Sequence, residues 1–189
     1  LFSSLNRAGL EVKSLTLEPI AALSVAIPPG MRLLNLALVD IGAGTSDIAL
    51  VREGNVFAYA MVPLAGDELT EYLASQYLLD FDTAERAKRL LMEQDQIEVS
   101  DILGNPLHLS GKELQQEIKP LVDEMTAEIA RHITDLNQKV TDAVVCVGGG
   151  SLTPSLTASL AENLGIPARR VGIRTIQNID YITTDSSFL

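Results

Sequence analysis

The sequence predicts an α/β fold in which a mixed sheet carries helices on both faces and a small lobe is inserted. Three observations predict it. Three strand-like runs follow one another across turns of a few residues, and connections this short force antiparallel pairing. Two nearly all-apolar runs, residues 34–41 and 143–147, are typical of strands buried on both faces. Helical segments separate the later runs, and such crossovers place helices against a sheet.

The first elements lie before the sheet. Residues 2–8 have helical spacing that stops at Gly9, a residue favoured just after a helix. Residues 12–17 alternate well enough to predict a short strand. Pro19 then opens a helix over residues 20–26.

The antiparallel part follows directly. Residues 34–41, 47–52 and 56–62 predict three strands joined by short turns, which is a meander. Apolar and aromatic residues at helical spacing then predict a helix over residues 67–79.

The next stretch predicts the inserted lobe, at about residues 82–110. It holds a charged helix over residues 83–92 and two short strand-like runs split by Gly104-Asn-Pro106. A long helix then covers residues 111–139, and Pro120 inside it predicts a kink or a break into two helices.

The last elements complete the fold. The buried strand at residues 143–147 leads through three glycines to a helix over residues 153–164 and a short strand over residues 170–173. The whole order matches the ribonuclease-H-like fold. We therefore expect one such domain over residues 1–173, followed by a polar tail at residues 174–189.

The composition excludes several classes of protein. A net charge of −11 argues against a nucleic-acid-binding protein, which needs a basic face. No apolar run approaches the roughly 20 residues that span a bilayer, and no signal-peptide pattern opens the chain. The single cysteine, Cys146, lies in an apolar run and predicts a buried, inert thiol in a reducing, cytoplasmic compartment. Because the chain opens on Leu1, we expect it to be a fragment of a longer protein.

A glycine-rich hairpin, Asp40-Ile-Gly-Ala-Gly-Thr-Ser-Asp47, is the first candidate for chemistry. Gly42 and Gly44 let successive backbone N–H groups converge on one anion, and Thr45 adds a hydroxyl. A carboxylate beside phosphate is repulsive without a cation, so Asp40 indicates Mg²⁺ held through water. From these residues alone, a tight hairpin with acidic ends is an equal alternative.

A second glycine-rich turn, Gly148-Gly-Gly-Ser151, joins a buried strand to a helix. The N-terminus of a helix carries free N–H groups and partial positive charge, so this turn also predicts a phosphate or nucleoside platform. Two such turns at strand ends of one sheet strengthen the interpretation, because ligands of open sheets bind at such crevices.

Both turns resemble motifs of one superfamily, that of actin, sugar kinases and heat-shock chaperones. Asp40-Ile-Gly-Ala-Gly-Thr45 is similar to its phosphate-2 motif, and Gly148-Gly-Gly-Ser151 to its adenosine motif. Ala84-Glu-Arg-Ala-Lys88 resembles the chaperone helix that presents a Glu and a Lys to the adenosine. The short inserted lobe and the ending Leu164-Gly-Ile-Pro-Ala-Arg-Arg-Val171 resemble bacterial cell-division FtsA-like proteins most.

The resemblance implies ATP or ADP as ligand, Mg²⁺ as cofactor and a role for each motif residue. Asp40 would order the Mg²⁺ shell, and Glu18 would polarise the attacking water, unless it is simply a helix-start acid. Glu85 and Lys88 would hold the nucleoside, with a surface salt bridge as the alternative. The backbone-rich sites complete the set: Gly42, Ala43, Gly44 and Thr45 for the phosphates, and Gly149, Gly150 and Ser151 for the nucleoside.

Nothing upstream of Asp40 resembles the superfamily's other phosphate hairpin, so we expect weak hydrolysis by this chain alone. The resemblance implies an ATP-binding scaffold in bacterial cell division or a related membrane-associated assembly. Its expected partners are another domain of the same protein, further copies of itself or cell-division proteins. This segment itself would not touch the membrane, although its parent would lie at the inner face. The alternatives are a catalytically silent pilus-assembly-type interaction module, a DnaK-like chaperone fragment and a small-molecule kinase.

Overall fold

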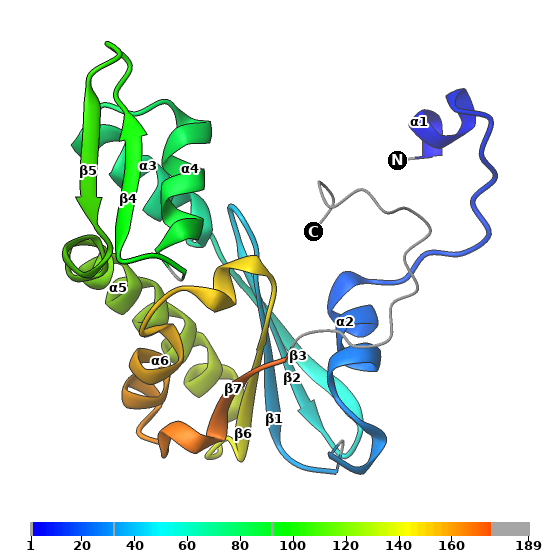
Figure 1. Cartoon of the computed structure of the whole chain (residues 1–189). Helices are drawn as coiled ribbons and strands as arrows, with labels where there is room; N and C mark the ends of the chain where they lie inside the picture. Colours follow the sequence, from blue (N-terminus) through cyan, green and yellow to red (C-terminus); the bar gives the residue numbers. More distant parts are fainter. Residues whose placement is uncertain (1, 32, 92, 175–189) are drawn as a thin grey trace.

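A five-stranded sheet forms the centre of the protein, and a separate two-stranded sheet pairs β4 with β5 (Figure 1). The computed structural model describes residues 2–31, 33–91 and 93–174. The strands are β1 (Leu36–Ile41), β2 (Ser46–Arg52), β3 (Asn55–Val62), β4 (Gln96–Ser100), β5 (Pro106–Ser110), β6 (Ala143–Val147) and β7 (Val171–Ile173). The α-helices are α1 (Phe2–Arg7), α2 (Glu18–Ala26), α3 (Gly66–Tyr77), α4 (Phe81–Leu90), α5 (Gly111–Asn137) and α6 (Leu156–Leu164).

The strand order of the main sheet is β3-β2-β1-β6-β7. Strands β1, β2 and β3 pair antiparallel, as their short turns require, whereas β6 lies parallel to β1 and β7 parallel to β6. The predicted meander and the mixed sheet are therefore confirmed. In this register Asp40 on β1 lies opposite Asp47 on β2 and Val147 on β6.

Helices cover both faces of the sheet, as expected. Figure 1 shows α5 and α6 on one side and α2 on the other. The two cores follow from the alternation of β1: Val39 belongs to the core under α3, α5 and α6, while Leu38 belongs to the core under α2. Strand β1 is thus buried on both faces, which explains its nearly continuous apolar sequence.

A local hydrogen bond fixes where α4 begins. The Asp80 carboxylate accepts from the backbone N–H of Thr83 (2.9 Å) and begins α4.

Helix α5 continues through Pro120 without the predicted break. Pro120 and Gln116, whose carbonyl loses its helical donor, both lie on the exposed side, where water can satisfy that carbonyl.

Two predictions of secondary structure are wrong. Residues 12–17 form no strand and are largely exposed, because alternation alone does not make a strand without a partner to pair with. The helix predicted from Thr153 begins at Leu156, after a 3₁₀ turn over Gly149–Leu152. The backbone of Thr153 is extended (ψ 133°), as the following Pro154 demands, and Ser155 takes a positive φ of 65°.

The domain division proposed from the sequence stays a prediction, although the strand pair on which its lobe rests is present as β4 and β5. Helix α1 buries none of its residues and lies apart from the sheet in Figure 1. Residues 175–189 of the expected polar tail lie outside the described residues.

Candidate functional site

The β1–β2 hairpin is held in place by its carbonyl groups. The carbonyl oxygens of Gly42 and Ala43 accept from the first N–H groups of α3, those of Gly66 (3.1 Å) and Asp67 (2.7 Å). Within the described part of the chain, the backbone N–H groups of Ala43 and Gly44 have no acceptor. The hairpin is therefore fixed against α3 while these two N–H groups remain able to bind an anion.

Acidic side chains gather at the base of the hairpin. Burial, followed by the negative charges of Glu18 and Asp47, raises the pKa of Asp40. The Thr45 hydroxyl donates to the Asp47 carboxylate (3.0 Å). A raised pKa means that the ionised form of Asp40 is disfavoured here, and a bound cation would offset this unfavourable electrostatic energy.

The second glycine turn lies directly against the end of β1. Gly148 has a φ of +82°, and a Cβ at this position would collide with the Asp40 carboxylate and the carbonyl oxygen of Ile41. A Cβ on Gly150 would meet the Ile41 side chain as well. Ser151 is buried and its hydroxyl donates to the Gly148 carbonyl (2.7 Å), so this side chain shapes the turn.

Lys88 on α4 uses all three of its N–H donors inside the protein. Its ammonium donates to the carbonyl oxygen of Gly66 (2.9 Å), to the Thr70 hydroxyl (2.8 Å) and to the Glu85 carboxylate. Burial would raise the pKa of Glu85, but hydrogen bonds from Lys88, Thr70 and Arg89 outweigh it and lower that pKa to about 2. Glu85 and Lys88 thus form a structural ion pair, and their predicted contact with a nucleoside stays a prediction.

These bonds connect α4 to the hairpin through a single residue. Gly66 accepts from Lys88 with its carbonyl group and donates to the Gly42 carbonyl with its N–H group. A Cβ on Gly66 would press on both partners, at 3.1 and 3.2 Å. We call this chain of contacts, Lys88–Gly66–Gly42, the α4–hairpin link.

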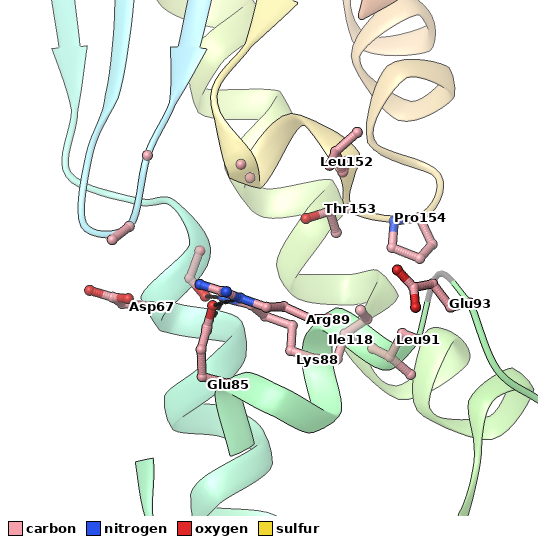
Figure 2. Close-up of a pocket in the computed structure, with 15 residues that line it drawn as sticks. Asp67, Glu85, Lys88, Arg89, Leu91, Glu93, Ile118, Leu152, Thr153 and Pro154 are labelled. Carbon is pink, nitrogen blue, oxygen red and sulfur yellow. Dashed lines mark hydrogen bonds and ion pairs between the residues drawn. The ribbon is translucent and has the colours of Figure 1, made fainter. Parts of the chain in front are cut away.

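One pocket of about 540 Å³, a usual size for a small-molecule site, is lined by the hairpin, by Glu85 and Lys88 of α4, and by the second glycine turn (Figure 2). Its lining residues are Gly42, Ala43, Gly66, Asp67, Glu85, Lys88, Arg89, Leu91, Glu93, Ile118, Gly149, Gly150, Leu152, Thr153 and Pro154. Figure 2 shows Glu85, Lys88 and Arg89 converging near the middle, and Leu91, Glu93 and Pro154 at the end away from Asp67.

The predicted site residues divide into two groups. Six line the pocket: Gly42, Ala43, Glu85, Lys88, Gly149 and Gly150. Five do not: Glu18, Asp40, Gly44, Thr45 and Ser151. Of these five, Glu18 and Asp40 lie close enough to interact electrostatically, and Gly44 and Thr45 are exposed on the hairpin.

The apolar end of the pocket was not predicted from the sequence. The residues come from three segments far apart in the chain, and no local pattern marks those segments as neighbours: Leu91, Ile118, and Leu152 with Pro154. Asp67 could have been found, because it is an acidic residue in the first turn of α3.

Three further observations limit the chemistry. Within the described ranges, no three His, Cys, Asp or Glu residues are arranged to hold a metal ion. Cys146 is buried, and burial raises the pKa of its thiol to about 12, as expected for an inert cysteine. No helix in the described part of the chain is long and apolar enough to cross a membrane.

The sequence is similar to those of cell division proteins. A family model described as cell division protein FtsA matches residues 37–185. Cell division protein FtsA of Bacillus subtilis is 27% identical over 176 residues, which are 87% of this chain and 39% of that protein. The chain therefore spans less than half the length of this relative.

Solved structures show the same fold. A PilM–PilN type IV pilus biogenesis complex matches with a TM-score of 0.67 and 23% identity, covering 92% of this chain and 48% of the other. MreB 5 of Spiroplasma citri bound to AMPPNP matches with a TM-score of 0.66 and 19% identity, covering 91% of this chain and 57% of the other. These likenesses support an actin-like, ribonuclease-H-like fold, which confirms the fold expected from the sequence.

Proposed function

Because this chain belongs to the family of cell division protein FtsA, we propose that its pocket binds ATP with Mg²⁺ and forms one wall of a nucleotide cleft. The observation that carries the proposal is the convergence of three separate segments on one pocket: the β1–β2 hairpin, α4 and the turn after β6. A tight hairpin with acidic ends would not explain why the other two segments meet it.

The phosphates would lie against the hairpin. The free N–H groups of Ala43 and Gly44 can donate to phosphate oxygens, and the Thr45 hydroxyl can turn from Asp47 to do the same. The charged groups beside the hairpin are acidic: Asp40, Asp47 and Asp67. The two cations that line the pocket, Lys88 and Arg89, are already paired with Glu85, so the chain itself offers the phosphates little free positive charge. Binding should therefore depend on a cation.

The donor set at the base of the hairpin fits a hydrated Mg²⁺. Burial, followed by the charges of Glu18 and Asp47, raises the pKa of Asp40 and so disfavours its anion. No three carboxylates of the described residues enclose an ion directly. Asp40 would accept hydrogen bonds from water in the Mg²⁺ shell, and Glu18 would orient a further water. A bound Mg²⁺ would supply positive charge to the phosphate oxygens.

The nucleoside would lie between the second glycine turn and α4. Gly149 has open space where a side chain would be, so a ligand can approach its backbone. Glu85 retains acceptor capacity for a ribose hydroxyl, because a carboxylate has about four acceptor sites. Lys88 would position Glu85 and the hairpin, and Ser151 would hold the shape of the turn.

Hydrolysis would need groups from outside this chain. Phosphoryl transfer depends on positioning and charge stabilisation on all sides of the phosphate, and the hairpin surrounds it on one. We therefore propose Asp40, through the Mg²⁺ shell, and Glu18, through the attacking water, as the catalytic carboxylates of a longer cytoplasmic, FtsA-like protein that acts as a scaffold in cell division. That protein would bind further copies or division proteins and lie peripherally at the inner face of the membrane.

Calorimetry tests the proposal directly. Mg-ATP is titrated into the chain and into Asp40→Ala, with Asp135→Ala as a control that removes an exposed carboxylate far from the pocket in the fold. We expect measurable binding to the chain and to the control, and at least about tenfold weaker binding to Asp40→Ala. Equal affinity in all three would remove Asp40 from the site. No binding to any of them would favour a silent interaction module.

A further inference from the structure

The end of the pocket away from the hairpin is mostly apolar, and its polar groups are the Thr153 hydroxyl and one carboxylate. Leu91, Ile118, Leu152 and Pro154 provide its walls, and Figure 2 shows the Glu93 side chain between Leu91 and Pro154. We propose that Glu93 is the residue that reads the base, by accepting a hydrogen bond from the exocyclic amine of adenine. This inference rests on the proposed function, because it deepens the assignment of the same pocket.

The order of groups along the pocket places the base at this end. Phosphates belong at the hairpin, where N–H groups are free, and the ribose belongs beside Glu85 in the middle. A purine base is flat and apolar on its faces, so it fits between Leu91 and Leu152. Its polar atoms lie around its edge, and the edge is what Glu93 would meet.

Within the described residues, neither oxygen of the Glu93 carboxylate has a hydrogen bond, whereas both oxygens of Glu85 already accept one. The carboxylate of Glu85 is bonded to Thr70, Lys88 and Arg89. Glu93 has no side-chain hydrogen bond and no ion pair with any described residue. Asp67 also lines the pocket but lies beside Gly44, at the phosphate end.

The chemistry of a carboxylate gives this contact a direction. An ionised carboxylate accepts hydrogen bonds and cannot donate them. It therefore favours the adenine 6-amino group, a donor, and gains nothing from a purine without that group. A charged acceptor makes a stronger bond than a neutral one, so losing the amine should weaken binding measurably.

The test compares two ligands that differ in one group. ATP and purine riboside triphosphate, which lacks the 6-amino group, are titrated with Mg²⁺ into the chain and followed by heteronuclear NMR. We expect ATP to bind about fivefold to tenfold more tightly. Glu93→Met, which removes the acceptor at similar size, should bring the two affinities to within about twofold.

Two companion variants separate this role from a general effect. Glu93→Gln keeps one acceptor oxygen and should retain an intermediate preference for ATP. Glu124→Met, an exposed position on α5 outside the pocket, should leave the preference unchanged. The amide spectrum of each variant reports whether it is folded.

The outcomes distinguish this inference from the proposed function. If the unchanged chain binds both ligands equally, or Glu93→Met keeps the preference for ATP, Glu93 does not read the base while the pocket still binds nucleotide. If the unchanged chain binds neither ligand, the proposed function fails, and the assignment of Glu93 fails with it.

Discussion

Replacing Lys88 by Met tests whether the α4–hairpin link holds the site together. The substitution keeps the length of the side chain and removes the three bonds of the ammonium, to Gly66, Thr70 and Glu85. It leaves the Gly66 carbonyl without its lysine donor and Glu85 with Arg89 and Thr70 as partners.

The magnitude follows from burial. The Lys88 side chain is 16% exposed and that of Glu85 is 26% exposed, so this pair lies between a surface and a buried ion pair. Breaking a fully buried pair costs about 3–5 kcal/mol, and an exposed one contributes about 0–1 kcal/mol. We expect Lys88→Met to lower the free energy of unfolding by about 2–3 kcal/mol, measured by urea denaturation.

Arg89 supplies the matched control, because it bonds the same carboxylate from a side chain that is 71% exposed. Arg89→Met should cost less than about 1 kcal/mol. Lys88→Met should also shift the amide NMR signals of Gly42 and Ala43, since the link ends there. If both variants cost the same and the hairpin signals do not move, the link has no structural role.

Three other perturbations have defined outcomes. Asp40→Asn should stabilise the free chain by about 0.5–1 kcal/mol at neutral pH, because it removes a like charge opposite Asp47. Denaturation should show that this gain vanishes at acid pH, where Asp40 is protonated. Calorimetry should show that the variant no longer binds Mg-ATP. Gly148→Ala should destabilise by at least about 2 kcal/mol through its positive φ and its collision with β1, whereas Gly149→Ala, with open space around it, should be nearly neutral in the same denaturation assay. Ionised Glu85 should stabilise the fold by about 1–2 kcal/mol, after allowing for its partial exposure. This stabilisation should be present above pH 4.5 and lost as pH falls toward about 2. The difference in stability between the chain and Glu85→Gln should therefore shrink over that range.

Sequence alone could predict much of the sheet because its cues are local. The short turns after Ile41 and Arg52 allow only antiparallel neighbours, and the apolar runs of β1 and β6 indicate burial on both faces. The two glycine turns and the spacing of Glu85 and Lys88 are also local, and all three reappear around one pocket.

The remaining features depend on contacts between distant parts of the chain. Residues 12–17 have a strand-like pattern but no neighbouring strand, which the pattern cannot reveal. One donor of Lys88 bonds the carbonyl of Gly66, 22 residues away, so the positioning role of Lys88 follows from packing between α3 and α4. The base end of the pocket joins Leu91, Ile118 and Pro154, which only the tertiary fold brings together.

Amide NMR can show whether the hairpin and the turn after β6 bind one Mg-ATP between them, as we propose. We expect saturable shifts on adding Mg-ATP that concentrate at Ala43, Gly44 and Gly149, and much smaller shifts when EDTA removes the Mg²⁺. Shifts confined to another surface, or equal shifts with and without Mg²⁺, would contradict the account.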